Sequence, residues 1–322
     1  MTDYVNSPAN NRPAAASVEN DLLREFLWEN LKEKKRARRW NIAFRVFIAA
    51  YLMFFLFVFL DSEVPSTGGD HTALIEVDGI IAADGEVRAD DVVAGLRDAF
   101  EAEDVKGVIV RINSPGGSPV QAGYINSEIR RLREKYPDIP LYAVVSDMCA
   151  SGGYYIAAAA DKIFVDKASI VGSIGVLMDG FGFVDAMKKL GIERRLLTAG
   201  KYKGLLDPFS PLDAKGEEHA SELLAQIHQQ FIDIVKQGRG SRLSDDPDLF
   251  TGLFWTGEKA KELGLVDEFG SAGSVARDII GAEKIIEYTQ EESVLDRIAK
   301  QIGVGVAETL QLRAGFSMPG LR

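Results

Sequence analysis

The stretch Val105-Lys-Gly-Val-Ile-Val-Arg-Ile-Asn-Ser-Pro-Gly-Gly-Ser118 decides the fold class of this chain. Its first half is β-branched and apolar, which predicts a strand over 105–112. The strand ends in Asn113 to Ser118, where two glycines permit a close approach of the backbone to a ligand. Their N–H groups can stabilise negative charge on a reacting oxygen. An ordinary tight turn explains the same residues.

Strands and helices alternate on both sides of this stretch. Similar runs and helical spacing predict strands at 72–77, 141–145, 163–165 and 194–197, and helices at 89–102, 121–136, 184–190, 214–237 and 257–263. This alternation favours an α/β core with parallel strands joined by right-handed crossovers.

Charge and cysteine content limit the function classes. The 322 residues carry a net charge of −11, which argues against nucleic acid as a partner. The one cysteine, Cys149, cannot form an internal disulfide. It lies two residues before Ser151 and is an alternative nucleophile, but a small buried thiol is the favoured interpretation.

The N-terminal part predicts a membrane anchor. A basic block over 32–39 precedes an apolar run at 42–60, whose helical length of about 28 Å matches one hydrocarbon core. A cleaved signal peptide is the main alternative, but the run lacks a good cleavage site. The basic flank places the N-terminus in the cytoplasm and the rest of the chain across the membrane.

These observations divide the chain into consecutive parts. The predicted parts are a cytoplasmic extension (1–39), a transmembrane helix (40–60), a linker (61–71), a catalytic domain (72–290) and a helical tail (291–322). The apolar spacing of the tail predicts a helix that packs on its own domain, with a partner or membrane contact as the alternative.

Ser151 is the first candidate for chemistry. It follows the strand predicted at 141–145 and precedes Gly152-Gly153, so it lies where a strand turns into a helix. Free N–H groups at a helix start favour developing negative charge, and that of Gly152 is a candidate oxyanion donor. The residue fits a nucleophile and a helix N-cap equally well.

A serine nucleophile needs a base, and the sequence favours a lysine. The three histidines, His71, His219 and His228, lie in the linker or on the long helix and lack an obvious acidic partner. Lys203 and its rival Lys201 lie in a mostly apolar loop. Such surroundings disfavour the charged form, and only a neutral lysine accepts a proton.

Several motifs together resemble the signal peptide peptidase family of serine–lysine proteases in its short, single-domain form. The resemblance covers about 72–288 and rests on Asn113–Gly117, Ala150–Tyr155, Val171–Val176, Gly200-x-x-Lys203, Trp255–Glu258 and Gly264–Asp267.

The resemblance implies roles for particular residues. It makes Ser151 the nucleophile, Lys203 the general base and Ser173 the residue that orients the lysine, with the N–H groups of Gly117 and Gly152 as oxyanion donors. It also implies the Clp protease/crotonase-like ββα superhelix and a ring-shaped homo-oligomer enclosing a chamber, without metal or cofactor. The implied substrates are signal peptide remnants and other apolar unfolded peptides at the cytoplasmic (inner) membrane.

Two other function classes stay open. A crotonase-like enzyme acting on an acyl thioester would use the same oxyanion loops without the Ser151–Lys203 pair. A non-catalytic membrane scaffold of the same fold would leave Ser151 unreactive toward serine-directed probes.

Overall fold

The computed structural model describes residues 14–60 and 69–290, which fall into two compact units. One unit contains the long helix α1 (Ala14–Leu60), and the other contains all later elements. The second unit mixes strands and helices, so the predicted α/β class is confirmed. Most of the predicted linker (61–68) and the predicted tail (291–322) lie outside the described residues.

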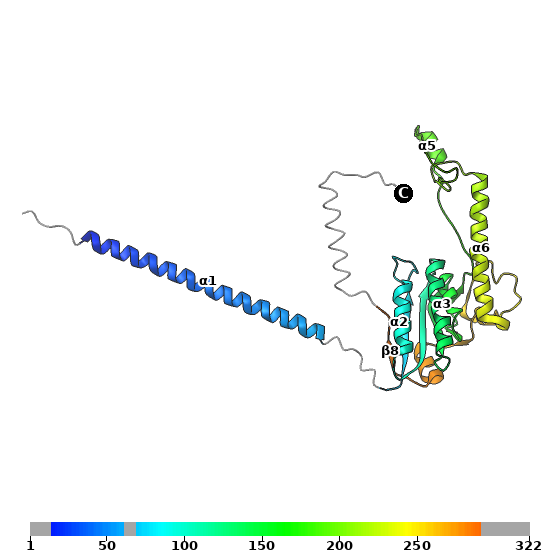
Figure 1. The fold of residues 1–322 in the computed structure, drawn as a ribbon, viewed down its shortest axis with the longest axis horizontal. Helices are drawn as coiled ribbons and strands as arrows, with labels where there is room; N and C mark the ends of the chain where they lie inside the picture. Colours follow the sequence, from blue (N-terminus) through cyan, green and yellow to red (C-terminus); the bar gives the residue numbers. More distant parts are fainter. Residues whose placement is uncertain (1–13, 61–68, 291–322) are drawn as a thin grey trace, which may run out of the picture. The chain divides into compact units, whose positions relative to one another are not determined.

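An eight-stranded sheet forms the centre of the second unit (Figure 1). Its path runs β6-β5-β3-β2-β1-β8, with β4 beside β3 and β7 beside β4. The strands are β1 (His71–Asp78), β2 (Val105–Ser114), β3 (Leu141–Ala150), β4 (Lys162–Val165), β5 (Ile170–Gly172), β6 (Phe254–Thr256), β7 (Glu268–Phe269) and β8 (Ile285–Glu287). Among the pairs within residues 69–290, β5–β6 is the antiparallel one. The strands predicted at 72–77, 105–112 and 141–145 are confirmed.

Helices follow the strands as crossovers and close the core. They are α2 (Ala89–Glu101), α3 (Pro119–Lys135), α4 (Gly152–Ala157), α5 (Val184–Leu190), α6 (Ala214–Arg239), η1 (Gly240–Arg242), α7 (Gly257–Glu262), α8 (Ala272–Ser274) and η2 (Val275–Ile280). Alternate residues of β1 point to opposite faces of the sheet. Ile75 therefore packs in the larger core with α2 and α3, whereas Leu74 packs with α8 and η2.

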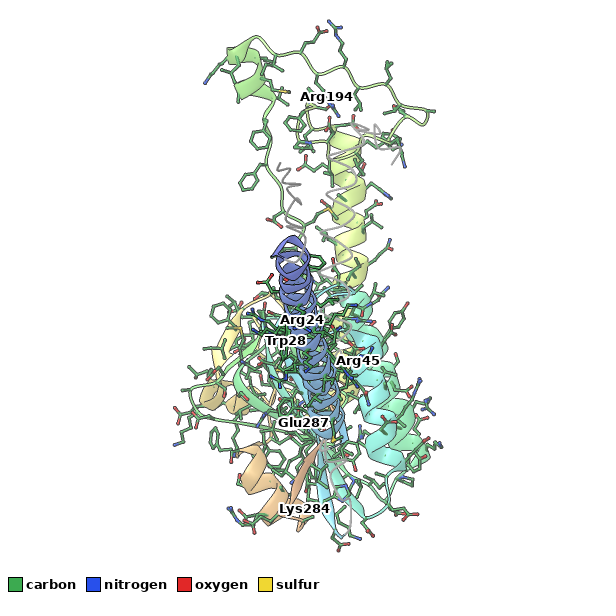
Figure 2. All side chains as sticks on the ribbon, turned by 90° about the vertical axis from the view of Figure 1, so that its left-hand side faces the viewer. Arg24, Trp28, Arg45, Arg194, Lys284 and Glu287 are labelled. Carbon is green, nitrogen blue, oxygen red and sulfur yellow. The ribbon has the colours of Figure 1, made fainter. Side chains whose placement is uncertain are left out.

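Helix α6 and the segment 176–213 before it form an arm that extends away from this core. The 26 residues of α6 extend about 39 Å. The buried side chains of Phe231 and Val235 lie in its C-terminal half, while α5 and its flanking loops lie beyond its N-terminal end (Figure 1). Figure 2 shows Arg194 in this arm, far from Lys284 at the opposite end of the same unit.

The strand predicted at 194–197 is wrong. The structure has an extended but unpaired segment there, and Leu197 is 96% exposed. No neighbouring strand supplies the ladder hydrogen bonds that would turn this extended segment into part of a sheet.

The described part of the N-terminal unit, residues 14–60, is one continuous helix. Helix α1 runs from Ala14 to Leu60 and joins the predicted extension to the predicted transmembrane helix. Within the part of the chain that the structure describes, no helix has both the length and the apolar character needed to cross a bilayer. The transmembrane helix predicted at 40–60 falls within α1 and stays a prediction.

Candidate active site

Ser151 occupies a strained turn between β3 and α4. Its φ and ψ are 50° and −119°, a combination that residues with a side chain rarely adopt. Its N–H donates to the Gly172 carbonyl at 2.9 Å, and its own carbonyl accepts from Tyr155 at 3.0 Å. The side chain makes no capping hydrogen bond. The backbone is thus held on both sides, and the hydroxyl is not used as a helix cap.

The Gly117 nitrogen lies beside the same turn. Ile81 bridges this loop by donating to the Gly116 carbonyl at 3.0 Å and accepting from the Ser118 N–H at 2.7 Å. In this parallel bridge the hydrogen bonds of Ile81 go to the residues on either side of Gly117. The N–H of Gly117 itself is therefore directed away from Ile81. A Cβ built on Gly152 would lie 3.3 Å from the Gly117 nitrogen. The predicted oxyanion residues Gly117 and Gly152 are therefore neighbours.

Gly116 brings the two loops into direct contact. A Cβ at this position would lie 2.7 Å from Ser151 Cβ and 2.8 Å from the Gly152 nitrogen. Its φ of +104° also excludes most side chains. Only a glycine lets the loop after β2 pack against the turn that carries Ser151.

Ser173 shares a pocket of about 550 Å³ with Ser151 and Gly117. The other residues that line it are Pro115, Pro119, Gly175, Val176, Leu177, Thr251 and Gly252. The Ser173 N–H donates to the Leu253 carbonyl at 2.7 Å, continuing the β5–β6 pairing. Sequence reasoning missed Thr251 and Gly252, whose only signal was their position just before the Trp255 motif.

Lys203 lies elsewhere in the same chain. Its side chain is exposed and does not line the Ser151 pocket. Its turn packs on the start of α6, where Leu205 contacts Gly216. The same helix reaches the pocket wall 12 residues later, where His228 Nε2–H donates to the Ile174 carbonyl at 3.1 Å. That separation is about 18 Å along the helix, so one chain does not bring Lys203 to Ser151.

Lys201, the rival base, lies in the same turn as Lys203. Its Nζ is 5.1 Å from the centre of the Tyr202 ring, and it does not line the pocket either.

The remaining candidates for nucleophile and base, Cys149 and the three histidines, do not line the Ser151 pocket. Cys149 is completely buried, and burial raises the pKa of its thiol, so it is not an accessible nucleophile. The buried His71 lies 2.9 Å from the Tyr288 hydroxyl, and His219 is exposed. None of the three histidines lines the pocket of Ser151.

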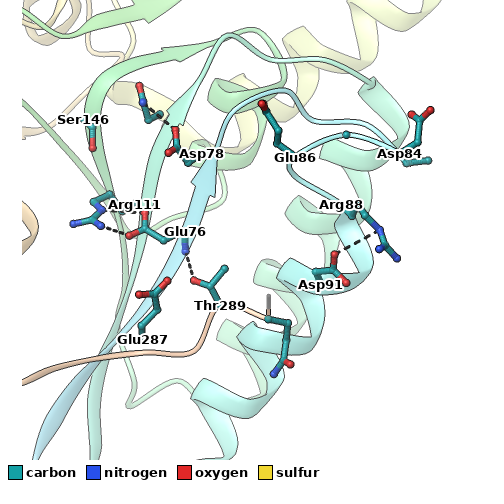
Figure 3. Close-up of a pocket in the computed structure, with 14 residues that line it drawn as sticks. Glu76, Asp78, Asp84, Glu86, Arg88, Asp91, Arg111, Ser146, Glu287 and Thr289 are labelled. Atoms are coloured by element: carbon teal, nitrogen blue, oxygen red, sulfur yellow. Dashed lines mark hydrogen bonds and ion pairs between the residues drawn. The ribbon is translucent and has the colours of Figure 1, made fainter. Parts of the chain in front are cut away.

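A larger cavity, of about 960 Å³, contains none of the predicted site residues (Figure 3). Two ion pairs lie in it, Arg111–Glu76 between β2 and β1 and Arg88–Asp91 at the start of α2. Arg111 donates to Glu76, which raises the pKa of Arg111, and Asn113 donates to Asp78 at 3.0 Å. Of the predicted site residues, Gly117, Ser151 and Ser173 line the smaller pocket instead.

A serine on a strained strand-to-helix turn, beside a backbone N–H that faces it, is a typical arrangement in serine hydrolases. The fold and site together define a mixed α/β protein with a candidate serine nucleophile.

Comparisons with known proteins identify the family. Residues 133–283, which include Ser151, Ser173 and Lys203, match Peptidase family S49. "Putative protease MJ0651" of Methanocaldococcus jannaschii is 33% identical over 67% of this chain and 72% of its own length. "Putative signal peptide peptidase SppA" of Enterococcus faecium is 29% identical over 76% of this chain and 73% of its own. The chain belongs to peptidase family S49.

A further relative carries a different name. "Na(+)/H(+) antiporter NhaA" of Brucella abortus is 44% identical over 68% of this chain, but the matched segment spans 30% of that relative's length. Since the match covers less than a third of that protein, its name assigns no activity to this chain.

Proposed function

We propose that this chain is an endopeptidase in which Ser151 is the nucleophile and Lys203 the general base. The N–H groups of Gly117 and Gly152 stabilise the oxyanion, and Ser173 orients the lysine. The observation that carries the proposal is the Ser151 hydroxyl, free of any capping bond, in a pocket it shares with Gly117 and Ser173. We also propose the Clp protease/crotonase-like ββα superhelix as its fold.

Each proton in the proposed reaction has a defined destination. Neutral Lys203 takes the hydroxyl proton as Ser151 Oγ bonds to the peptide carbonyl carbon, and the oxygen of that carbonyl becomes the oxyanion. The C–N bond then breaks, and the Lys203 ammonium gives its proton to the leaving amine. Water attacks the acyl-serine while Lys203 accepts a proton from it. Return of that proton to Ser151 Oγ releases the acid.

We propose that Lys203 acts on Ser151 of a neighbouring copy within a ring-shaped homo-oligomer. The separation along α6 keeps the two residues apart in one chain. The arm that carries Lys203 also exposes many large apolar side chains, an arrangement that marks an interaction surface. They include Leu177, Phe181, Leu190, Ile192, Leu197 and Leu212.

The proposed substrates are apolar unfolded peptides, including remnants of signal peptides. The pocket wall is formed mainly by prolines, glycines and aliphatic residues, which suit an extended apolar chain. We further propose that the chain associates with a membrane. Support comes from the exposed apolar side chains between Trp40 and Phe55, which follow the basic block.

Mixing two inactive variants tests the shared site. Ser151→Ala and Lys203→Ala are each expected to lose cleavage of an unstructured apolar peptide. Unfolding and reassembling them together restores activity to about a quarter of the sites if neighbouring copies share the site. Lys201→Ala is the matched control and keeps activity. Full activity in Lys203→Ala would overturn the base assignment, and absence of any rescue would overturn the shared site.

The same Ser151→Ala variant separates the other function classes. An acyl-thioester hydrolysis that survives the loss of Ser151 would identify a crotonase-like enzyme. A parent protein that fails to react with a serine-directed phosphonate would instead identify a scaffold.

A further inference from the structure

We infer that Ser114 is a positioning residue that holds the oxyanion loop in its productive orientation. The inference rests on the proposed function, because it assigns Ser114 a role only through Gly117 and Ser151. Ser114 is completely buried at the end of β2 and does not line the pocket. It therefore acts without touching the substrate.

The Ser114 hydroxyl makes two hydrogen bonds with opposite roles. It donates to the Gly79 carbonyl at 2.6 Å and accepts from the Gly116 N–H at 3.1 Å. Since a hydroxyl has one proton, donation to Gly79 leaves a lone pair directed at Gly116. Gly79 is itself fixed, because its N–H donates to the Asn113 carbonyl at 2.9 Å. One buried side chain thus joins the loop after β1 to the loop after β2.

Fixing Gly116 fixes the direction of the next N–H. A trans peptide is planar, so the Gly117 N–H points opposite to the Gly116 carbonyl. That carbonyl accepts from the Ile81 N–H at 3.0 Å, so the Gly117 N–H points away from Ile81, and its nitrogen lies 3.3 Å from a Cβ built on Gly152. Ser114 holds one end of Gly116 and Ile81 holds the other, which leaves the Gly117 N–H aimed at the turn of Ser151.

The loop needs this restraint because it contains two adjacent glycines. Gly116 and Gly117 have φ values of +104° and +147°, and glycine moves among such conformations at little cost. Without the Ser114 hydroxyl, the hydrogen bonds of Ile81 alone would oppose a rotation that turns the N–H away and directs a carbonyl toward the developing oxyanion. A misdirected oxyanion donor lowers kcat rather than the affinity for substrate.

Ser169, which lies just before β5 of the same sheet, offers a matched control. It is also buried, donates to the Ser146 carbonyl at 2.6 Å and accepts from the Asp166 N–H at 3.1 Å. It has the same pair of bonds but does not line the Ser151 pocket. Ser114→Ala and Ser169→Ala therefore remove equivalent interactions, and their melting temperatures are expected to fall by similar amounts.

The test compares kcat, KM and inhibition by a peptide aldehyde in the full-length parent and these variants. Complete loss of one oxyanion donor costs about 10²–10³ in kcat. Partial misdirection of the N–H in Ser114→Ala is expected to lower kcat about 10–100-fold, while KM changes by no more than about twofold. Inhibition by the peptide aldehyde is expected to weaken by a factor similar to that for kcat. Ser169→Ala is expected to keep the parent's values. Ser114→Cys, which keeps the volume but bonds weakly, is expected to fall between parent and alanine variant.

Equal kcat in Ser114→Ala and Ser169→Ala would overturn the inference while leaving the peptidase intact. If Ser114→Ala fails to fold, the kcat values of Ser114→Cys and Ser169→Cys are compared in the same way. A parent protein that does not cleave the peptide, or one whose activity survives Ser151→Ala, would instead overturn the proposed function and the inference with it.

Discussion

The backbone strain at Ser151 predicts an unusual order of stabilities. Replacing Ser151 by alanine keeps the Cβ and hence the strain at φ 50° and ψ −119°. Replacing it by glycine removes both, because glycine adopts positive φ at no steric cost. We therefore expect Ser151→Gly to unfold with a larger free energy than Ser151→Ala, although both lack the proposed nucleophile.

The magnitude follows from two opposing effects. A residue held in such a sparsely populated region costs on the order of 1–3 kcal/mol. Glycine removes that cost. It also raises the conformational entropy of the unfolded chain, which lowers the free energy of unfolding by roughly 0.4–1 kcal/mol. The difference favours Ser151→Gly over Ser151→Ala by about 1 kcal/mol, which corresponds to about 2–4 °C in melting temperature for a unit of this size.

Urea unfolding and melting curves of the two variants measure the difference. The same pair of substitutions at Ser146 is the control, since that residue lies in extended backbone within β3. There glycine is expected to be less stable than alanine by about 0.5–1 kcal/mol. If Ser151→Ala were as stable as Ser151→Gly, the turn would not be strained, and the argument from its geometry would be wrong.

Three further predictions follow from other contacts. Gly172→Ala places a Cβ 2.8 Å from a tryptophan ring at φ +118°, so both melting temperature and peptide cleavage should fall. Asp267→Asn leaves the buried Arg239 without its carboxylate, and urea unfolding should show a loss of about 3–5 kcal/mol. Hydrogen bonds from Arg131 and a second arginine lower the pKa of Glu128 from 4.5 to about 2. The resulting stabilisation is present above pH 4.5 and is lost as the pH falls toward 2, so Glu128→Gln should flatten this part of a stability–pH profile.

Much of the fold could be predicted because long apolar strands and amphipathic helices are encoded locally. The strands beginning near 72, 105 and 141 and the helices near 89, 121 and 214 all form close to their predicted bounds. The short strands β5 and β6 were missed, since three-residue strands carry no periodicity. They form because Val171 pairs with Trp255, a contact between segments far apart in the sequence.

The sequence could predict the position of the Ser151 and Gly117 loops, but it could not predict the position of Lys203. Ser151 follows β3 directly and Gly117 follows β2, and these neighbouring parallel strands bring both loops to one edge of the sheet. Their meeting therefore follows from the strand pattern alone. Lys203 instead lies on an arm whose apolar residues pack on nothing in this chain's core.

No pattern within the sequence could fix the distance from this lysine to Ser151, because the proposed contact involves a second copy. The short apolar loop around Lys203 favoured a buried base, yet in one chain the side chain is exposed. An apolar loop can be buried by its own domain or by a neighbouring subunit, and composition does not distinguish these. Assembly should both bury Lys203 and complete the site, so a dissociated monomer should bind peptide without cleaving it.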